Sequence, residues 1–427
     1  MNELTNSQPT SESARIESLD VVRGFALLGI FAVNIIAFAL PMHYLFVPVF
    51  AYSGGPDAAA WVVMELGFEG AMRCLFSILF GAGVALFLSG GRGAKAHYVR
   101  NFWLLVFGLV DAYLFLWLGD ILFLYALVGF VLYFVRDVRP SRLITTALVL
   151  IGLMSLQYWA MGFGLSQAEQ AAERVAQMQA AGETPSPQLQ EGANAWHEFV
   201  KETVPSEEQE AEEIQLRTSS YASAFQWNIG MVNEQFLFTL PIFLFWDALA
   251  MMLLGMALYK MGILQGDRSP QFYRCLMWGS LAAALLINGW EVWRAIQSNF
   301  ALLDTFPQMR WTYQFGRLAL AAFWFALLMN FIKGGVFTAL RQRLANVGRM
   351  ALTNYLSQSL IGLILFTGAG FGLVGQFGLA ELYLVVIAVW LLQLWLSTWW
   401  LGRYRFGPVE WLWRGLTYNK FPENARD

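Results

Sequence analysis

The sequence predicts an all-α fold, a polytopic bundle of about ten transmembrane helices with a helical extracytoplasmic insertion. Of its 427 residues, 57% are hydrophobic and 13% are charged, whereas soluble domains carry about 25% charged residues. Mean hydropathy is +0.49, and 18 Trp residues suit a chain with many membrane interfaces. This composition excludes most soluble enzymes, and a net charge of −3 offers no basic surface for nucleic acid.

Ten apolar runs approach or exceed the length of about 20 residues that a spanning helix needs. They are residues 22–42, 60–89, 101–118, 120–135, 143–163, 236–259, 275–298, 311–332, 350–372 and 380–401. The fourth run is short, so residues 101–135 are expected to form a tight helical hairpin. The second is long enough to bend at Gly67 and Gly70, and Asp57 is a candidate N-cap at its start.

The distribution of cations predicts the orientation. With both termini inside, 20 of the 27 Lys and Arg residues lie on the cytoplasmic side, and residues 164–235 outside carry three cations against 12 Glu. The first 14 residues lack a basic n-region, so the first span is expected to be retained. We therefore expect a multi-pass protein of the bacterial inner (cytoplasmic) membrane with both termini cytoplasmic.

The insertion divides the chain into three predicted parts. Residues 1–163 form an N-terminal five-helix half, and residues 236–427 form a second five-helix half that ends in a cytoplasmic interfacial helix. Between them, residues 164–235 form an acidic extracytoplasmic loop, either a small helical cap or a solvated spacer. Its helices are expected at 166–182 and 188–216.

Five segments carry a resemblance to one family. They are Arg15-x-x-x-Leu19-Asp20-x-x-Arg23-Gly24-x-Ala26, Leu79-Phe80-Gly81-Ala82-Gly83, Gly119-Asp120-Ile121-Leu122, Gly348-Arg349-Met350-Ala351-Leu352-Thr353-Asn354-Tyr355 and Gly407-Pro408-Val409-Glu410-Trp411-Leu412-Trp413-Arg414. In this order they resemble the YeiB-like family of bacterial integral membrane proteins, a domain of unknown function. The first segment is also distantly similar to transmembrane acyltransferases. The resemblance implies an acyl group moved from a cytoplasmic donor to an outward acceptor. A His often precedes the Gly-Asp-Ile-Leu turn in that family, where this chain has Asp111-Ala112-Tyr113.

A donor site is expected at the cytoplasmic mouth of the first span. Asp20 precedes Arg23 by three residues, so the two can pair on one helical face. Guanidinium groups bind phosphates bidentately, so Arg15, Asp20, Arg23 and Arg349 are candidate residues for an acyl-CoA donor. Anchoring of the helix by positive charge is the alternative explanation.

A polar site is expected deeper in the membrane. Asn34 lies about 16 Å beyond Arg23 along a helix, and a buried amide needs partners. Asn34 is therefore a candidate substrate-binding residue, and Asn354 and Tyr355, in the family motif of residues 348–355, are two further candidates. Helix–helix packing is the alternative role for such amides.

Three residues are candidates for catalysis. His43, at the outer end of the first helix, or Asp120, at the outer turn, could act as general base. Arg73 could stabilise an oxyanion, and its spacing from Glu69 predicts an ion pair. A solvated His43 and a purely structural Arg73 are the alternatives.

The sequence contains no P-loop, serine-hydrolase elbow, dinucleotide fingerprint or zinc-ligand spacing. The leading hypothesis is an acyltransferase-like membrane protein that uses acyl-CoA and a glycan or lipid-linked acceptor. The alternative is a transporter or lipid-handling protein without acyl transfer, or a scaffold. Membrane lipids are expected partners, a homo-oligomer is possible, and no metal or nucleic acid is expected.

Overall fold

The computed structural model describes residues 16–48, 54–91 and 93–426, which form helices and no strand beyond one bridge between Tyr404 and Ala425. Seven helices or helix pairs are long and apolar enough to cross a membrane: α1 (Glu17–Ala39), α2 with α3 (Gly55–Ser89), α6 (Pro140–Ala180), α9 to α10 (Tyr221–Lys260), α11 (Pro270–Gln297), α13 (Tyr313–Lys333) and α16 (Leu379–Leu401). Leu122–Val135 and α15 (Ala351–Phe366) are shorter apolar helices. With α4 (Ala94–Tyr113), every predicted run lies on a helix. The predicted all-α membrane bundle is confirmed.

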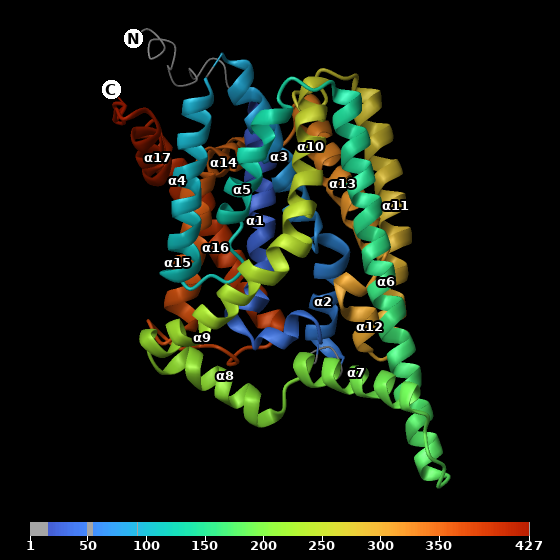
Figure 1. Ribbon diagram of the computed structural model, residues 1–427. Helices are drawn as coiled ribbons and strands as arrows, with labels where there is room; N and C mark the ends of the chain where they lie inside the picture. Colours follow the sequence, from blue (N-terminus) through green and yellow to red (C-terminus); the bar gives the residue numbers. More distant parts are fainter. Residues whose placement is uncertain (1–15, 49–53, 92, 427) are drawn as a thin grey trace.

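The two ends of the bundle differ. Figure 1 shows the start of α1 and the C-terminal helix α17 (Pro408–Tyr418) at one end, here called the proximal end. Helices α7 (Pro187–Thr203) and α8 (Glu207–Ser219) cross the opposite, distal end. Helices α7 and α8 of the insertion therefore lie on the opposite side of the bundle from the start of α1 and from α17.

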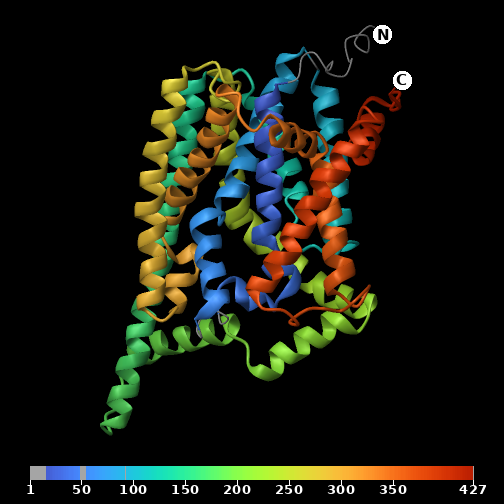
Figure 2. The ribbon, with the colours of Figure 1, turned by 180° about the vertical axis from the view of Figure 1, so that it is seen from behind.

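Two groups of helices make up the bundle. In the α1 lobe, α1 packs on α14 (Thr338–Arg349), α15 and α16, and α4 packs on α5 (Leu122–Leu132) and α17. In the α10 lobe, α10 (Phe245–Lys260) packs on α3 and α6, and α11 packs on α13. Figures 1 and 2 show α6, α11 and α13 along one flank and α4, α15 and α16 along the other.

The second predicted run bends where the glycines indicate. Helix α2 (Gly55–Gly67) ends at Gly67, and α3 (Ala71–Ser89) begins after Gly70, whose φ of +64° favours glycine. The prediction that Asp57 caps this run was wrong. Its carboxylate instead accepts a hydrogen bond from the backbone N–H of Ala380 (2.8 Å), so it caps α16.

The predicted tight hairpin over residues 101–135 has a different form. Residues 114–121 are not helical, and α5 has only 11 residues, a length of about 16 Å. A Cβ added to Gly108 would lie 2.3 Å from the backbone nitrogen of Phe123, so the first residues of α5 lie beside Gly108. Gly108 is more than one helical turn before the end of α4. Helix α5 is therefore a half-length helix whose N-terminus lies inside the bundle.

The insertion also differs in detail from its prediction. Helix α6 runs unbroken to Ala180, and the helix expected at 188–216 is divided at Val204. Helix α9 (Tyr221–Glu234) then continues through a π-helical segment, Gln235–Leu244, into α10. The predicted C-terminal interfacial helix begins only at Pro408.

Helix α8 is docked on the distal end of α1. Arg217 donates hydrogen bonds to the carbonyl oxygens of Ala37 (2.9 Å), Phe38 (2.9 Å) and Leu40 (2.7 Å) and to the Glu213 carboxylate (3.0 Å). The last carbonyls of a helix have no partner within it, so Arg217 serves as the C-cap of α1. Helix α8 of the insertion is thus hydrogen-bonded to the bundle.

Candidate functional site

A cavity of about 260 Å³, here called the proximal cavity, lies between the helices of the α1 lobe and helix α3 of the α10 lobe. Its polar lining consists of Asp20, Arg23, Arg100, Tyr125, Arg349, Tyr355, Glu410 and Arg414. Its apolar lining includes Leu19, Phe76, Leu79, Phe80, Leu86, Phe87, Leu104, Leu122 and Leu352. The cavity therefore combines a cluster of guanidinium groups with an apolar interior.

Two glycines place Arg23 and Arg349 on the same cavity. A Cβ added to Gly24 would lie 2.0 Å from the carbonyl oxygen of Leu344, and one added to Gly348 would lie 2.0 Å from that of Asp20. Helices α1 and α14 can cross this closely only because both positions lack a side chain. The arginines beside these glycines therefore both line the proximal cavity.

The predicted pair of Asp20 and Arg23 forms, with 2.9 Å between the carboxylate and the guanidinium. A second, polar groove of about 480 Å³ adjoins it and shares Asp20 and Arg349 with the proximal cavity. Its further polar lining consists of Glu17, Gln342, Asn346, Thr398 and Arg426. Asp20 and Arg349 therefore border both the proximal cavity and this groove.

Helix α17 closes the proximal cavity through Glu410. The carboxylate accepts hydrogen bonds from the backbone N–H of Leu352 (2.7 Å) and Thr353 (3.1 Å) and from the Thr353 hydroxyl (2.5 Å), so it caps α15. Burial raises the pKa of Glu410 above its usual value, although these hydrogen bonds lower it. The indole of Trp413 donates to the Arg100 carbonyl (2.9 Å). Glu410 was not among the predicted site residues, although it lies in the motif of residues 407–414.

Tyr355 stands at the deep end of the proximal cavity. Its hydroxyl accepts hydrogen bonds from the indole of Trp117 and the backbone N–H of Ile121, both at 3.1 Å, and it lies beside the Asp120 carboxylate. With a side chain only 2% exposed, Tyr355 joins α15 to the loop that precedes α5. It is the predicted substrate residue that the structure places on the cavity.

Asp120 caps the half-length helix. Its two carboxylate oxygens accept hydrogen bonds from the backbone N–H of Leu122 (3.0 Å) and Phe123 (2.8 Å). Asp111, fully buried on α4, lies beside Asp120 and Ser359. Two buried carboxyl groups therefore lie beside Tyr355, and only Asp120 was a predicted catalytic residue.

His43 lies at the distal end, under α8. Its Nε2 is 3.5 Å from the Glu210 carboxylate, and its Nδ1 has no hydrogen-bond partner among the described residues. Burial lowers the pKa of His43, although Glu210 and Glu213 raise it. The imidazole faces the docked insertion and is not part of the proximal cavity.

The remaining candidate residues lie elsewhere. Arg15 is outside the described residues. Asn34 is half-buried on α1 and is not among the residues that line the proximal cavity. The Asn354 amide donates hydrogen bonds to the Ser397 hydroxyl (2.9 Å) and the Val347 carbonyl (3.2 Å), so it joins α15 to α14 and α16. The structure thus brings together Asp20, Arg23, Arg349 and Tyr355.

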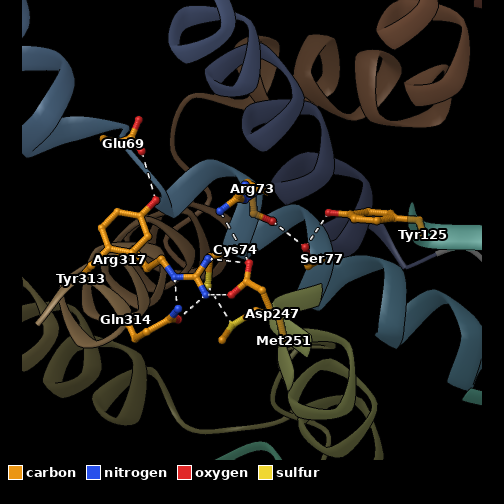
Figure 3. A network of polar contacts seen from close by, with 10 residues as sticks. All are labelled: Glu69, Arg73, Cys74, Ser77, Tyr125, Asp247, Met251, Tyr313, Gln314 and Arg317. Atoms are coloured by element: carbon orange, nitrogen blue, oxygen red, sulfur yellow. Dashed lines mark hydrogen bonds and ion pairs between the residues drawn. The ribbon is translucent and has the colours of Figure 1, made fainter. Parts of the chain in front are cut away.

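Arg73 belongs to a buried ionic network beside the proximal cavity (Figure 3). It lies 3.6 Å from the Asp247 carboxylate, which also binds Arg317 through both guanidinium Nη groups. The predicted pair with Glu69 does not form, because Glu69 lies in the break between α2 and α3. Glu69 instead accepts a hydrogen bond from the Tyr313 hydroxyl (3.1 Å).

One contact links this network to the proximal cavity. The Ser77 hydroxyl donates to the Arg73 carbonyl (2.9 Å) and lies 2.5 Å from the hydroxyl of Tyr125, a cavity-lining residue (Figure 3). Arg73 itself is not among the lining residues. The link to the cavity therefore runs through the Arg73 backbone carbonyl, while the Arg73 guanidinium lies 3.6 Å from Asp247.

The fold and the site together define a class, that of polytopic helical membrane proteins with an amphipathic cavity at one end of the bundle. The chain belongs to the YeiB-like family, and residues 258–420 match the family model described as "Protein of unknown function (DUF418)". It is 30% identical over 430 residues to "Uncharacterized protein YxaH" of Bacillus subtilis, covering 97% of each chain. It is 32% identical over 408 residues to "Uncharacterized protein YeiB" of Escherichia coli, covering 94% of this chain and 95% of the relative. No solved structure matches the chain.

Proposed function

We propose that the protein is a membrane acyltransferase that takes an acyl group from a cytoplasmic acyl-CoA and passes it to an extracytoplasmic or lipid-linked acceptor. The observation that carries the proposal is the division of the proximal cavity into a guanidinium cluster and an apolar interior that ends at Tyr355. A phosphate-bearing acyl donor has the same two parts.

The donor would occupy both the proximal cavity and the adjoining groove, which share Asp20 and Arg349 as lining residues. Arg23, Arg100 and Arg349 suit phosphate oxygens because a guanidinium binds them with paired, charge-assisted hydrogen bonds. The adjoining polar groove offers space for the polar part of the donor, and the apolar lining suits the acyl chain.

The chemistry needs a base at the deep end. The acceptor hydroxyl oxygen attacks the thioester carbon, the carbon–sulfur bond breaks, and the hydroxyl proton passes to the base and then to the leaving thiolate. Asp120 is better placed than His43, because Asp120 adjoins the cavity-lining Tyr355 and Leu122. His43 faces Glu210 on the docked insertion.

The half-length helix α5 favours a second candidate, a transporter or lipid-handling protein. Discontinuous helices whose N-termini lie within the membrane form substrate sites in secondary transporters. Such a protein would bind an anionic amphiphile in the same cavity and release it unchanged.

Donor binding is tested by thermal stabilisation of the purified protein with CoA and acyl-CoA. Arg23→Lys and Arg349→Lys keep the charge but lose the planar fork, so each should reduce the stabilisation. Arg343→Lys is the matched control, because Arg343 is exposed on α14 and does not line the cavity. If CoA leaves the parent unchanged, or if all three variants behave alike, the donor site is wrong.

Acyl transfer is tested with labelled acyl-CoA in proteoliposomes. Asp120→Asn should lower the transfer rate by about 10²- to 10⁴-fold, the contribution of a general base, while His43→Gln should retain most of it. A variant profile in which His43→Gln is inactive and Asp120→Asn is active would reassign the base. Transport of intact donor without transfer would support the second candidate.

The proposal requires the proximal end to face the cytoplasm. In a Cys275→Ser background, single cysteines at Ala181 and Gln271, both exposed, should be labelled by an impermeant thiol reagent from opposite sides of the membrane. Labelling of the Gln271 position from outside intact cells would exclude a cytoplasmic donor at this cavity.

A further inference from the structure

A second cavity, here called the distal cavity, has a volume of about 310 Å³ and lies between α6, α11 and the segment joining α12 (Leu302–Thr305) to α13. Its aromatic walls are Trp159, Phe163, Trp290 and Trp311, and its polar lining includes Glu291, Arg294, Asp304, Arg310 and Thr312. Figure 1 shows these helices on the flank away from α4 and α15, so this cavity is separate from the proposed transfer site.

The polar floor of the distal cavity is buried and incompletely paired. The side chain of Arg310 is 9% exposed, and its Nη1 lies 3.0 Å from the Glu291 carboxylate and 3.8 Å from that of Glu65. The Thr312 hydroxyl also donates to Glu291. The Nε of Arg310, however, is buried without a hydrogen-bond partner among the described residues. A buried charged donor of this kind favours an anionic oxygen from a ligand.

The rim of the distal cavity presents aromatic rings and an ion pair. Trp159, Trp290 and Trp311 remain 51%, 43% and 50% exposed. Arg294 lies 2.6 Å from the Asp304 carboxylate, and its guanidinium is 5.3 Å from the ring centre of Trp290. Indole faces beside carboxylates attract a cation. Because Arg294 already occupies the Trp290 face and the Asp304 carboxylate, the exposed indoles of Trp159 and Trp311 are the place on the rim for an ammonium group.

The charges that line the distal cavity have both signs. A lone anion would face Glu291 and Asp304, and a lone cation would face Arg294 and Arg310. A ligand that carries a phosphate and an ammonium group satisfies both pairs, and Trp residues are enriched at the level of lipid headgroups. We propose that the distal cavity binds a zwitterionic phospholipid headgroup, with its phosphate on the Arg310 Nε and its ammonium group among the indoles.

Phosphatidylethanolamine and phosphatidylglycerol are the probes, because both carry a phosphate and only the first carries an ammonium group. The purified full chain, incubated with each lipid, should retain phosphatidylethanolamine in native mass spectrometry. Arg310→Lys keeps a cation for Glu291 but lacks the Nε donor. Its affinity for phosphatidylethanolamine should therefore be about tenfold lower than that of the parent, which corresponds to the loss of one charge-assisted hydrogen bond.

A second pair of variants keeps the proposal falsifiable if Arg310→Lys folds poorly. Trp159→Leu should also weaken retention of phosphatidylethanolamine. Trp395→Leu on α16, whose indole is 61% exposed, should not. If Trp159→Leu and Trp395→Leu lose phosphatidylethanolamine to the same extent, the lipid is bound by interfacial Trp residues in general and not by this cavity. If phosphatidylglycerol is retained as well as phosphatidylethanolamine, the cavity binds the phosphate and does not recognise the ammonium group. Either result would overturn the proposal. CoA-dependent stabilisation should be unchanged in Trp159→Leu, which separates this test from that of the proposed function.

Discussion

The two lobes use the same side chain, arginine, in different ways. In the α10 lobe, Arg73 and Arg317 both lie against one buried carboxylate, Asp247. In the α1 lobe, Arg23 and Arg349 line an open cavity, and Arg23 pairs with an acid that lines the same cavity.

The difference lies in what surrounds the charges. Asp247 is 6% exposed and is held from two helices, so its ionic contacts fasten α10 to α3 and α13. The cavity arginines border space that a ligand can enter. The charges around Asp247 therefore fasten helices to one another, whereas the charges of the proximal cavity are available to a ligand.

The strongest test of this comparison is Asp247→Asn. It leaves two guanidinium groups without their buried counter-charge, so the free energy of unfolding should fall by about 3–5 kcal/mol. Unfolding by SDS in mixed micelles measures this change.

The matched control is Asp20→Asn, because Asp20 is a partly exposed acid at the mouth of the proximal cavity. It should change the free energy of unfolding by about 1 kcal/mol or less while altering the stabilisation by CoA. Comparable losses of stability in both variants would remove the distinction between the lobes.

A smaller effect is expected from Gly24→Ala. The added Cβ would meet the Leu344 carbonyl at 2.0 Å, and such overpacking costs about 1–3 kcal/mol. The displacement of α14 should also weaken CoA-dependent stabilisation. Gly83→Ala provides the comparison, because Gly83 lines the same cavity and its added Cβ would have no heavy atom within 4 Å. Identical thermal midpoints for the two variants would contradict the importance of the α1–α14 crossing.

The smallest effect concerns the docked insertion. Since burial lowers the pKa of His43, the undocked state binds a proton more readily, and docking of α8 should weaken as pH falls from about 7.5 to about 5. Glu210 and Glu213 on α8 oppose this shift, which limits its size.

Hydrogen exchange of the α8 amides measures this pH dependence. His43→Gln should remove it, whereas His197→Gln on the exposed face of α7 should leave it intact. A pH dependence that persists in His43→Gln would assign it to another group.

The sequence predicted correctly those features that depend on residues close together in the chain. The bend at Gly67–Gly70, the pairing of Asp20 with Arg23 and the apolar runs all follow from residues within a turn or two of one another. The motif positions of Arg23 and Arg349 also pointed to the proximal cavity, since each stands beside a glycine at a helix crossing.

Distant pairings could not be predicted in the same way. The Arg73 guanidinium meets Asp247 on another helix, and Asp57 caps α16 rather than its own helix. Asn354, a predicted substrate-binding residue, likewise donates its amide to Ser397 on α16, a partner that the sequence did not indicate. One sequence reveals which groups need partners, but the packing of helices decides which partners they meet.

The Arg217 cap has a consequence for biosynthesis. Arg217 lies 177 residues after Leu40, whose carbonyl it binds. At a synthesis rate of roughly 5–20 residues per second, the interval between translation of Leu40 and translation of Arg217 is on the order of ten seconds or more. During that interval, the last carbonyls of the first helix must be satisfied by water or lipid headgroups. The first span is therefore synthesised before Arg217, the residue that caps its C-terminal end.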